Sequence, residues 1–231
     1  MIRKITVDYG GSKTKITCPG HMSLKKSKPL PLLHKTIGKV LKKWKIKDLP
    51  HLVIGAKSIW SKAERKWLYQ RTRHLAAKVT VMSDIELAHD GKFKGSHGIL
   101  LLAGTGSIAL GRGRNGKIAR AGGHGPKKGD EGSGYWIGKN YMKQILEKSG
   151  TISVQKTAAL APEVIKKASA GDSKCRHLIA EAHSHLVFLV ISIWEKLGEK
   201  NLPVELAGGL FENDYFREKF LNLLRTADSA F

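Results

Sequence analysis

Residues 98–138 read GILLLAGTGSIALGRGRNGKIARAGGHGPKKGDEGSGYWIG and hold 13 of the 25 glycines of this 231-residue chain. An apolar, strand-like run from Ile99 to Ala103 stops at Gly104-Thr105-Gly106-Ser107, and a second run from Ile108 to Leu110 leaves it. Glycine loops cost backbone entropy, so they are typical of places where the backbone approaches a ligand. The stretch therefore predicts the active-site half of an enzyme that transfers phosphoryl groups.

Outward from this stretch, strand-period and helix-period segments alternate along most of the chain, which favours the α/β class. Strands are expected at 2–8, 51–54, 79–82 and 204–206, and helices at 33–44, 61–74, 135–148, 162–170, 173–197 and 214–224. The capping-box pattern Ser61-Lys62-Ala63-Glu64 marks the start of the second of these helices. The segment from 19 to 31 carries prolines and lysines and is expected to be irregular. The polar, glycine-flanked segment at 91–95 predicts a boundary between two domains, 1–94 and 95–231.

The net charge of +22 is the most unusual global property of the chain. A basic surface attracts nucleic-acid phosphates. The lysines, however, are spread over several segments without an arginine-rich arm or a known nucleic-acid motif. This pattern favours a solvated, lysine-rich surface, with nucleic-acid binding left open as a side function. A positive field would also gather anionic nucleotides.

The remaining composition predicts a cytoplasmic protein without a membrane span. The chain runs directly into a strand-like segment without a secretory signal pattern. Its longest apolar run, Leu186 to Trp194, is about half of the ~20 residues that a membrane-spanning helix needs. Cys18 and Cys175 lie in unrelated contexts, so neither a disulfide framework nor a metal cluster is expected.

Two glycine hairpins are candidate phosphate sites. The first carries Asp8, Gly10, Gly11 and Thr14 behind a strand, and the second is the turn at 104–107. Successive backbone N–H groups in such a turn can bind a phosphate, and an acid at its base can hold Mg²⁺ through water. A plain glycine β-turn is the alternative for each. Neither hairpin matches the dinucleotide fingerprint or the Walker A loop.

Three acidic residues are candidates for chemistry. Asp84 follows the strand-like run 79–82, and ligands bind at the carboxyl ends of strands in open α/β sheets. Its carboxylate could accept the proton of a hydroxyl that attacks a γ-phosphate, or it could be a helix N-cap. Asp130 and Glu131 stand among glycines, where they could bind a polyol or orient a metal-bound water. Their alternative is to cap a helix that begins near Ser133.

Four segments together resemble a known family: VDYGGSKT, LLLAGTGSIALG, GGHGPKKGDEGSGYWIG and LAGGLFEN. They are similar to the N-acetylglucosamine kinases and the wider BadF/BadG/BcrA/BcrD ATPase family, of the sugar kinase, heat-shock protein and actin superfamily. GDEGSGYWIG is the most specific. The resemblance implies two ribonuclease H-like domains, an actin-like ATPase fold, with an interdomain cleft that closes on ATP and sugar. Compared with the family, the second domain is expected to be shortened at the C-terminus.

The resemblance assigns a role to each matching residue. Asp84 would be the catalytic base, which deprotonates the sugar 6-hydroxyl, and Asp8 would be the Mg²⁺-linked acid. The ATP and phosphate positions would be Asp8, Gly10, Gly11, Thr14, Thr105, Gly106, Gly208 and Gly209. The last two match the family's adenosine motif, where a side chain would collide with the nucleoside. The sugar positions would be Asp84, Ser107, Gly123, His124, Gly125 and Asp130.

The chain departs from the family pattern at several positions. His124 stands where the family usually has Trp, and Lys127 and Lys128 replace residues that are usually uncharged. The sequence also lacks a clear equivalent of the asparagine that contacts sugar in the first domain. The prediction is an ATP-dependent kinase of an amino sugar such as N-acetylglucosamine or glucosamine, with a homodimer left open. A non-catalytic sugar or nucleotide sensor is the alternative, and an iron–sulphur activator is disfavoured by the presence of only two cysteines.

Overall fold

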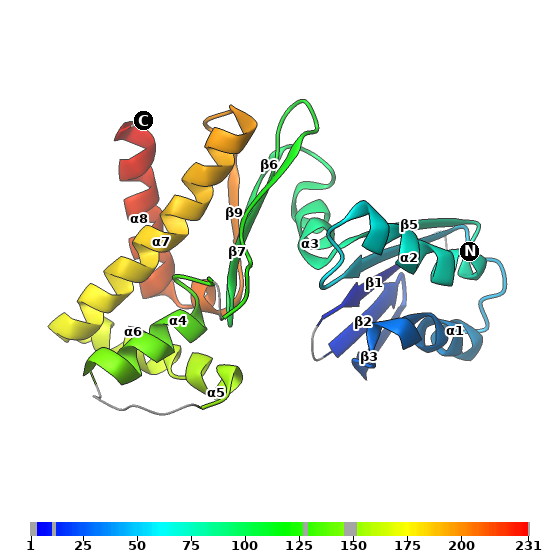
Figure 1. The fold of residues 1–231 in the computed structure, drawn as a ribbon, viewed down its shortest axis with the longest axis horizontal. Helices are drawn as coiled ribbons and strands as arrows, with labels where there is room; N and C mark the ends of the chain where they lie inside the picture. The colour runs from blue at the N-terminus through cyan, green and yellow to red at the C-terminus, as the bar shows by residue number, and fades with distance from the viewer. Residues whose placement is uncertain (1–3, 11–12, 127–128, 146–151, 231) are drawn as a thin grey trace. The chain divides into compact units, whose positions relative to one another are not determined.

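The computed structural model describes residues 4–10, 13–126, 129–145 and 152–230. The chain divides into two compact units, Met1–Lys94 and Gly95–Phe231, called unit 1 and unit 2 below. Each unit combines one β-sheet with helices, which is the α/β organisation predicted from the sequence (Figure 1).

Unit 1 contains a five-stranded sheet in the order β3-β2-β1-β4-β5. The three strands β1, β2 and β3 form an antiparallel meander, whereas β4 and β5 run parallel to β1. The strands are β1 (Lys4–Tyr9), β2 (Lys13–Cys18), β3 (His21–Lys26), β4 (His51–Ala56) and β5 (Lys78–Ser83).

The core of unit 1 lies on one face of this sheet. Alternation along β1 buries Ile5 and Val7 completely, and α1 (Leu33–Lys43) covers them with Leu33, Ile37 and Val40. These helix residues recur at three- and four-residue spacing, which places them on one side of the helix. The other helical segments of unit 1 are η1 (Leu30–Leu32), α2 (Lys62–Thr72), η2 (Arg73–Leu75) and α3 (Asp84–Phe93).

Helix α3 packs closely against β4. A Cβ added at Gly55 would lie 2.4 Å from Leu87 Cβ, so only glycine fits at this point of the strand. The close approach fixes the start of α3 beside the carboxyl ends of β4 and β5.

Unit 2 contains a four-stranded sheet in the order β8-β7-β6-β9. The strands β6, β7 and β8 again form an antiparallel meander, and β9 runs parallel to β6. The strands are β6 (Gly98–Ala103), β7 (Ser107–Arg112), β8 (Ile118–Gly122) and β9 (Val204–Ala207).

The long helix α7 (Ser173–Leu197) forms the centre of the core of unit 2. By length and composition alone it could cross a membrane, but half of its most apolar window is buried inside the protein, as in a core helix. Phe216 and Phe220 pack with it and are fully buried. The other helical segments are α4 (Gly134–Asn140), η3 (Tyr141–Ile145), α5 (Val154–Ala158), α6 (Ala161–Ser169), η4 (Gly209–Glu212) and α8 (Asp214–Ala230).

One local prediction is wrong, and the structure refines a second one. The segment expected to be irregular contains β3, which pairs with β2 along its whole length. Its side chains are nearly all exposed, so the strand leaves no alternating pattern in the sequence. The helix expected at 135–148 changes at Tyr141 from α-helix to a π-helical turn, and its last residues lie outside the described part of the chain.

Candidate active site

Asp8 and Asp84 lie at the same edge of the unit 1 sheet. In the parallel register, Asp8 is level with Gly55 of β4, and Gly55 is level with Met82 of β5. Ser83 ends β5, and Asp84 is the first residue of α3. Both carboxylates therefore occupy the carboxyl ends of parallel strands, where ligands bind in open α/β sheets.

The surroundings raise the pKa of both carboxyl groups. For Asp84, burial is the main cause, while the Ile85 N–H and the charge of Lys57 act in the opposite direction. For Asp8, partial desolvation is again the first cause, followed by the negative charge of Asp84, and Lys15 opposes both. A carboxylate with a raised pKa accepts a proton more readily, which is what a general base requires.

Asp84 does not cap its helix, so that alternative for its role is wrong. The N-cap of α3 is Ser83, whose Oγ accepts a hydrogen bond from the Glu86 N–H at 3.3 Å. Asp84 follows as the first helical residue, and its Oδ1 accepts from the Ile85 N–H at 2.9 Å. Ser83, the preceding residue, caps the helix.

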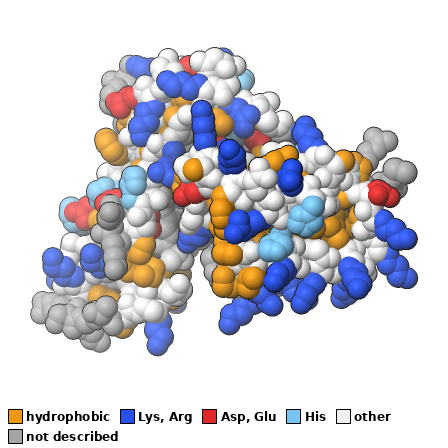
Figure 2. All heavy atoms as spheres, turned by 45° about the vertical axis from the view of Figure 1, so that its right-hand side comes forward, with side chains coloured by type: hydrophobic (Ala, Val, Ile, Leu, Met, Phe, Trp, Pro, Cys, Tyr) orange, Lys and Arg blue, Asp and Glu red, His pale blue; other side chains and the backbone are white. Residues whose placement is uncertain are grey.

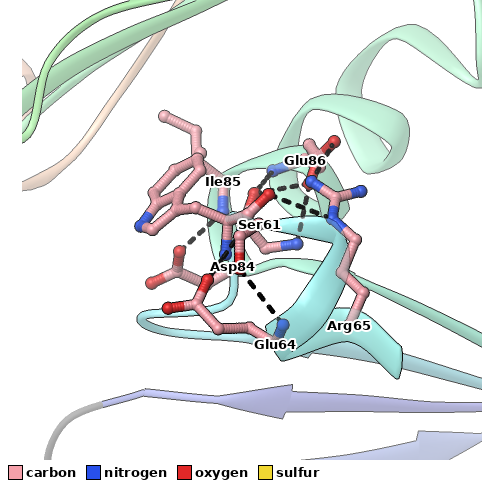
Figure 3. Close-up of polar contacts among 8 residues, drawn as sticks. Ser61, Glu64, Arg65, Asp84, Ile85 and Glu86 are labelled. Atoms are coloured by element: carbon pink, nitrogen blue, oxygen red, sulfur yellow. Dashed lines mark hydrogen bonds and ion pairs between the residues drawn. The ribbon is translucent and has the colours of Figure 1, made fainter. Parts of the chain in front are cut away.

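A network around Glu86 holds the start of α3 (Figure 3). Glu86 is 7% exposed, and its Oε2 accepts from the Ser83 N–H at 2.8 Å and from the Ser83 hydroxyl at 2.7 Å. Arg65 Nη2 of α2 lies 2.8 Å from the same oxygen. The N-terminus of α2 has a capping box of its own, formed by Ser61 and Glu64. Arg65 and Glu86 thus join two capped helix starts, one of which carries Asp84.

Sequence reasoning identified the capping box at Ser61 but missed this second one. The signal was present as Ser83-Asp84-Ile85-Glu86, a serine followed three residues later by glutamate,. The partnership of Glu86 with Arg65 crosses 21 positions and has no local signal.

The first glycine hairpin is held by hydroxyl groups. Thr14 is 1% exposed, and its Oγ1 lies 2.9 Å from Ser27 Oγ. Ser27 Oγ donates to the Gly10 carbonyl at 2.8 Å, so the Thr14 hydroxyl is the donor to Ser27. The predicted phosphate residue Thr14 therefore stabilises the turn through Ser27, and the Gly10 N–H bonds to the Lys13 carbonyl. The predicted residue Gly11 lies outside the described residues.

The second glycine hairpin is attached to the start of α4. The Gly134 N–H donates to the Gly104 carbonyl at 2.7 Å, and the Tyr135 N–H donates to the Thr105 carbonyl at 3.2 Å. Thr105 itself is exposed. A Cβ added at Gly106 would lie 2.7 Å from Asp130 Oδ2, so the absence of a side chain at Gly106 makes room for that carboxylate.

The loop around Asp130 packs beneath the hairpin. Asp130 is buried, has a left-handed φ of 61°, and its Oδ1 accepts from the Gly125 N–H at 3.3 Å. The N-cap of α4 is Ser133, so the alternative that Asp130 and Glu131 cap this helix is wrong. Ser107 is 2% exposed and donates to the Glu131 carbonyl at 2.7 Å.

The other predicted sugar residues lie on the neighbouring loop. Gly123 follows β8 with a φ of 69°, and a Cβ there would lie 2.5 Å from Ile108 Cδ1. His124 is exposed, and its Cβ would lie 3.2 Å from a Cβ added at Gly129. Gly125 has open space around it. Lys127 and Lys128 lie outside the described residues.

The predicted adenosine glycines have different surroundings. Gly208 has a φ of 98°, and a Cβ there would lie 2.3 Å from the Ala103 carbonyl oxygen, so the fold itself requires glycine. Gly209 has no atom within 4 Å of an added Cβ, so packing within the protein does not require glycine there. A Cβ at Gly104 would lie 3.9 Å from Gly209 N. The turns after the parallel strands β6 and β9 therefore meet at one sheet edge.

The described residues contain no group of three or more His, Cys, Asp or Glu side chains that could hold a metal ion. A magnesium ion needs less, because it keeps several water ligands and uses one or two carboxylates. Asp8 offers hard oxygen donors, and a cation beside it would offset the repulsion from Asp84. The residues present therefore fit Mg²⁺ bound at Asp8.

Several known proteins are similar to this chain. The N-acetylmuramic acid/N-acetylglucosamine kinase of Clostridium acetobutylicum is 34% identical over an alignment that covers 63% of this chain and 60% of that protein. The chain thus spans less than two thirds of the length of this relative. Among solved structures, a candidate N-acetylglucosamine kinase from Chromobacterium violaceum superimposes with a TM-score of 0.67 at 20% identity, covering 93% of this chain and 89% of that one.

The fold extends beyond sugar kinases. MamK bound to AMPPNP superimposes with a TM-score of 0.68 at 14% identity, covering 96% of this chain and 90% of that one. These likenesses confirm the predicted actin-like ATPase fold. The model of the BadF/BadG/BcrA/BcrD ATPase family matches residues 5–228, almost the full length of the chain. The chain belongs to the BadF/BadG/BcrA/BcrD ATPase family.

Proposed function

We propose that this protein is an ATP-dependent sugar kinase that transfers the γ-phosphoryl group of ATP to the 6-hydroxyl of an amino sugar such as N-acetylglucosamine or glucosamine. The observation that carries the proposal is the placement of Asp84. It is the first residue of a capped helix, at the carboxyl end of a parallel strand, with a raised pKa and a second carboxylate at the same sheet edge.

The relatives supply the substrate class. The C. acetobutylicum protein is a kinase of N-acetylmuramic acid and N-acetylglucosamine, and the aligned residues of this chain are 34% identical to it. Because the chain spans about 60% of that relative, transfer of its activity to this protein is part of the proposal.

In the proposed reaction, Asp84 accepts the proton of the sugar hydroxyl as its oxygen attacks the γ-phosphorus. The carboxylate becomes a carboxylic acid, and ADP leaves with the electron pair of the broken bond. General-base assistance of this kind contributes about 10²- to 10⁴-fold to a rate. Asp8 would hold Mg²⁺, which neutralises phosphate charge when bound.

The glycines of the two units have separate roles in the proposal. Thr105 and Gly106 of unit 2 would offer backbone N–H groups to a phosphate, whereas the Gly10 N–H of unit 1 is already bonded to the Lys13 carbonyl. Gly209 would lie against the nucleoside, which would explain a glycine that packing within the protein does not require. The sugar would contact His124, Gly125 and Asp130. We place this activity in the cytoplasm, with a homodimer left open.

The test is ATP consumption by the full chain with glucosamine, N-acetylglucosamine and N-acetylmuramic acid. The Asp84→Asn variant is expected to lose at least about 100-fold in kcat while it still binds ATP and sugar. Asp48→Asn is the matched control, because Asp48 is an exposed acid of the same unit. Full activity of Asp84→Asn, or no phosphorylation of any sugar, would contradict the proposal. Calorimetric binding of ATP or sugar without turnover would instead identify a sensor.

A further inference from the structure

The positive charge of this protein is concentrated in unit 1. Residues 1–94 contain 22 Lys and Arg against 6 Asp and Glu, a net charge of +16, whereas residues 95–231 carry 19 against 13, a net charge of +6. In Figure 2, blue side chains crowd the unit drawn on the right, with few red ones among them. The charge is therefore a property of one unit rather than an even coating.

Within unit 1, one continuous segment carries half of the cations. Residues 9–47 contain eleven lysines and no Asp or Glu, and all eleven lysines are exposed. The segment forms β2, β3 and α1. His21 of β3 stacks on Trp44 at the end of α1, with ring centroids 5.3 Å apart, so the strand pair and the helix form one continuous surface. We call these eleven side chains and their elements the lysine surface.

Helix α1 gives this surface an ordered row of charge. Lys35, Lys39, Lys42 and Lys43 share one helix side, opposite the buried Leu33, Ile37 and Val40,. From Lys35 to Lys43 the row is about 12 Å long, at 1.5 Å per residue. Lysines on an edge strand such as β3 discourage strand pairing between molecules, but that explanation does not extend to the four lysines of a helix.

We propose that the lysine surface binds the phosphate backbone of duplex nucleic acid without reading its sequence. Each DNA strand offers one phosphate per about 3.4 Å along the axis, so several phosphates face the α1 row at once. An anionic membrane fits less well. A basic helix binds a bilayer when it has a free apolar face, and α1 buries its apolar residues in the core.

The experiment measures binding of the full chain to a fluorescent 20-base-pair duplex by anisotropy between about 50 and 200 mM salt. Affinity is expected to fall steeply with salt, because each lysine–phosphate contact releases a counterion. The quadruple variant Lys35→Gln, Lys39→Gln, Lys42→Gln and Lys43→Gln is expected to lose at least about 10-fold in affinity, with a salt slope shallower by about 3.

A matched variant of unit 2 separates a local surface from net charge. Lys143→Gln, Lys156→Gln, Lys166→Gln and Lys174→Gln removes the same number of exposed charges and is expected to change affinity less than about 2-fold. Equal losses in the two variants would overturn the proposal, as would no duplex binding at low salt. Tighter binding to phosphatidylserine vesicles or polyglutamate than to the duplex would also overturn it. Neither variant alters the proposed kinase residues, so kinase assays are independent of this outcome.

Discussion

In unit 1 the carboxyl ends of the parallel strands carry two carboxylates, whereas in unit 2 the corresponding strand ends are surrounded by glycines. Both units place a three-stranded antiparallel meander beside a fourth strand parallel to the first. In unit 1, Asp8 near the end of β1 and Asp84 directly after β5 both have raised pKa values. In unit 2, the loops at the same ends are packed around Gly106, Gly134 and Gly208.

The difference indicates that two units with the same strand arrangement contribute different chemical groups. The acids of unit 1 can accept protons, and burial raises the pKa of both carboxyl groups. The glycines of unit 2 supply close backbone packing, since added Cβ atoms would collide with the protein itself. We therefore expect the candidate site of unit 1 to be sensitive to changes in charge and that of unit 2 to be sensitive to added volume.

The largest effect is expected from adding volume to unit 2. A Cβ at Gly138 would lie 1.9 Å from the Thr157 carbonyl oxygen, so Gly138→Ala must separate α4 from α5 and should cost at least about 3 kcal/mol in the free energy of unfolding,. Gly91→Ala in α3 is the contrast, because its Cβ would meet nothing within 4 Å. It should stabilise by about 0.5–1 kcal/mol. Urea unfolding measures the change in the free energy of unfolding for both variants. Equal changes in Gly138→Ala and Gly91→Ala would contradict the prediction.

A pH-dependent effect of similar size is expected in the core of unit 2. Burial lowers the pKa of His183 to about 4 from 6.5, beside Phe216. The folded state holds the neutral ring, so this stability is present above pH 6.5 and lost as the pH falls toward 4. The loss amounts to about 3 kcal/mol. His183→Gln should flatten this pH dependence, whereas His177→Gln on the exposed side of the same helix should leave it unchanged. Parallel profiles for wild type and His183→Gln would refute the assignment.

The two capping boxes of unit 1 offer a smaller and sharper test. Glu86 and Glu64 occupy the same position in their helices, but only Glu86 is buried and bound to Arg65. Glu86→Gln should cost about 1–3 kcal/mol and lower kcat by moving Asp84, with KM for the sugar little changed. Glu64→Gln should cost about 0.5–1 kcal/mol with no change in kcat. Thermal melts and steady-state kinetics separate the two, and an equal kcat in both variants would show that Arg65 and Glu86 do not position Asp84.

The smallest stability effect is expected at Asp8. Its raised pKa means that the folded state binds the proton more tightly than the unfolded state, so this contribution to stability is lost as the pH rises through the folded pKa,. Asp8→Asn should therefore raise the melting temperature at pH 7 by about 1–2 °C and leave it unchanged near pH 2. It should also weaken the magnesium dependence of ATP binding. A lower melting temperature at pH 7 would mean that Asp8 has a stabilising partner.

Prediction from sequence succeeded where local patterns determine structure. The helix at 173–197 and the capping box at Ser61 are confirmed, because each follows from residues a few positions apart. The edge strand β3 escaped prediction because Met22 and Leu24 point to solvent and no alternation marks a buried face. Strand pairing with β2 provides its stability, and pairing is a non-local property.

For the candidate site, the sequence indicates which residues are candidates, but it does not reveal what surrounds them. Asp84 was selected by its place after a strand, but its freedom from capping depends on Ser83 and Glu86. Glycine at position 208 was expected because a side chain there would collide with a bound nucleoside. The structure adds a second reason, since a Cβ at this position would collide with the Ala103 carbonyl even without a ligand. Such collisions join segments far apart in the chain, so a single sequence does not reveal them.

The contact between β4 and α3 has a consequence for how this family diverges. Because a Cβ at position 55 would lie 2.4 Å from the Cβ at position 87, the two positions cannot both carry side chains in this backbone. Among homologues that retain the carboxylate of Asp84 in this place, a residue larger than glycine at position 55 should occur only with glycine at position 87. An alignment would then show glycine in at least one of the two positions in every homologue. A homologue with side chains at both positions should have α3 displaced from β4.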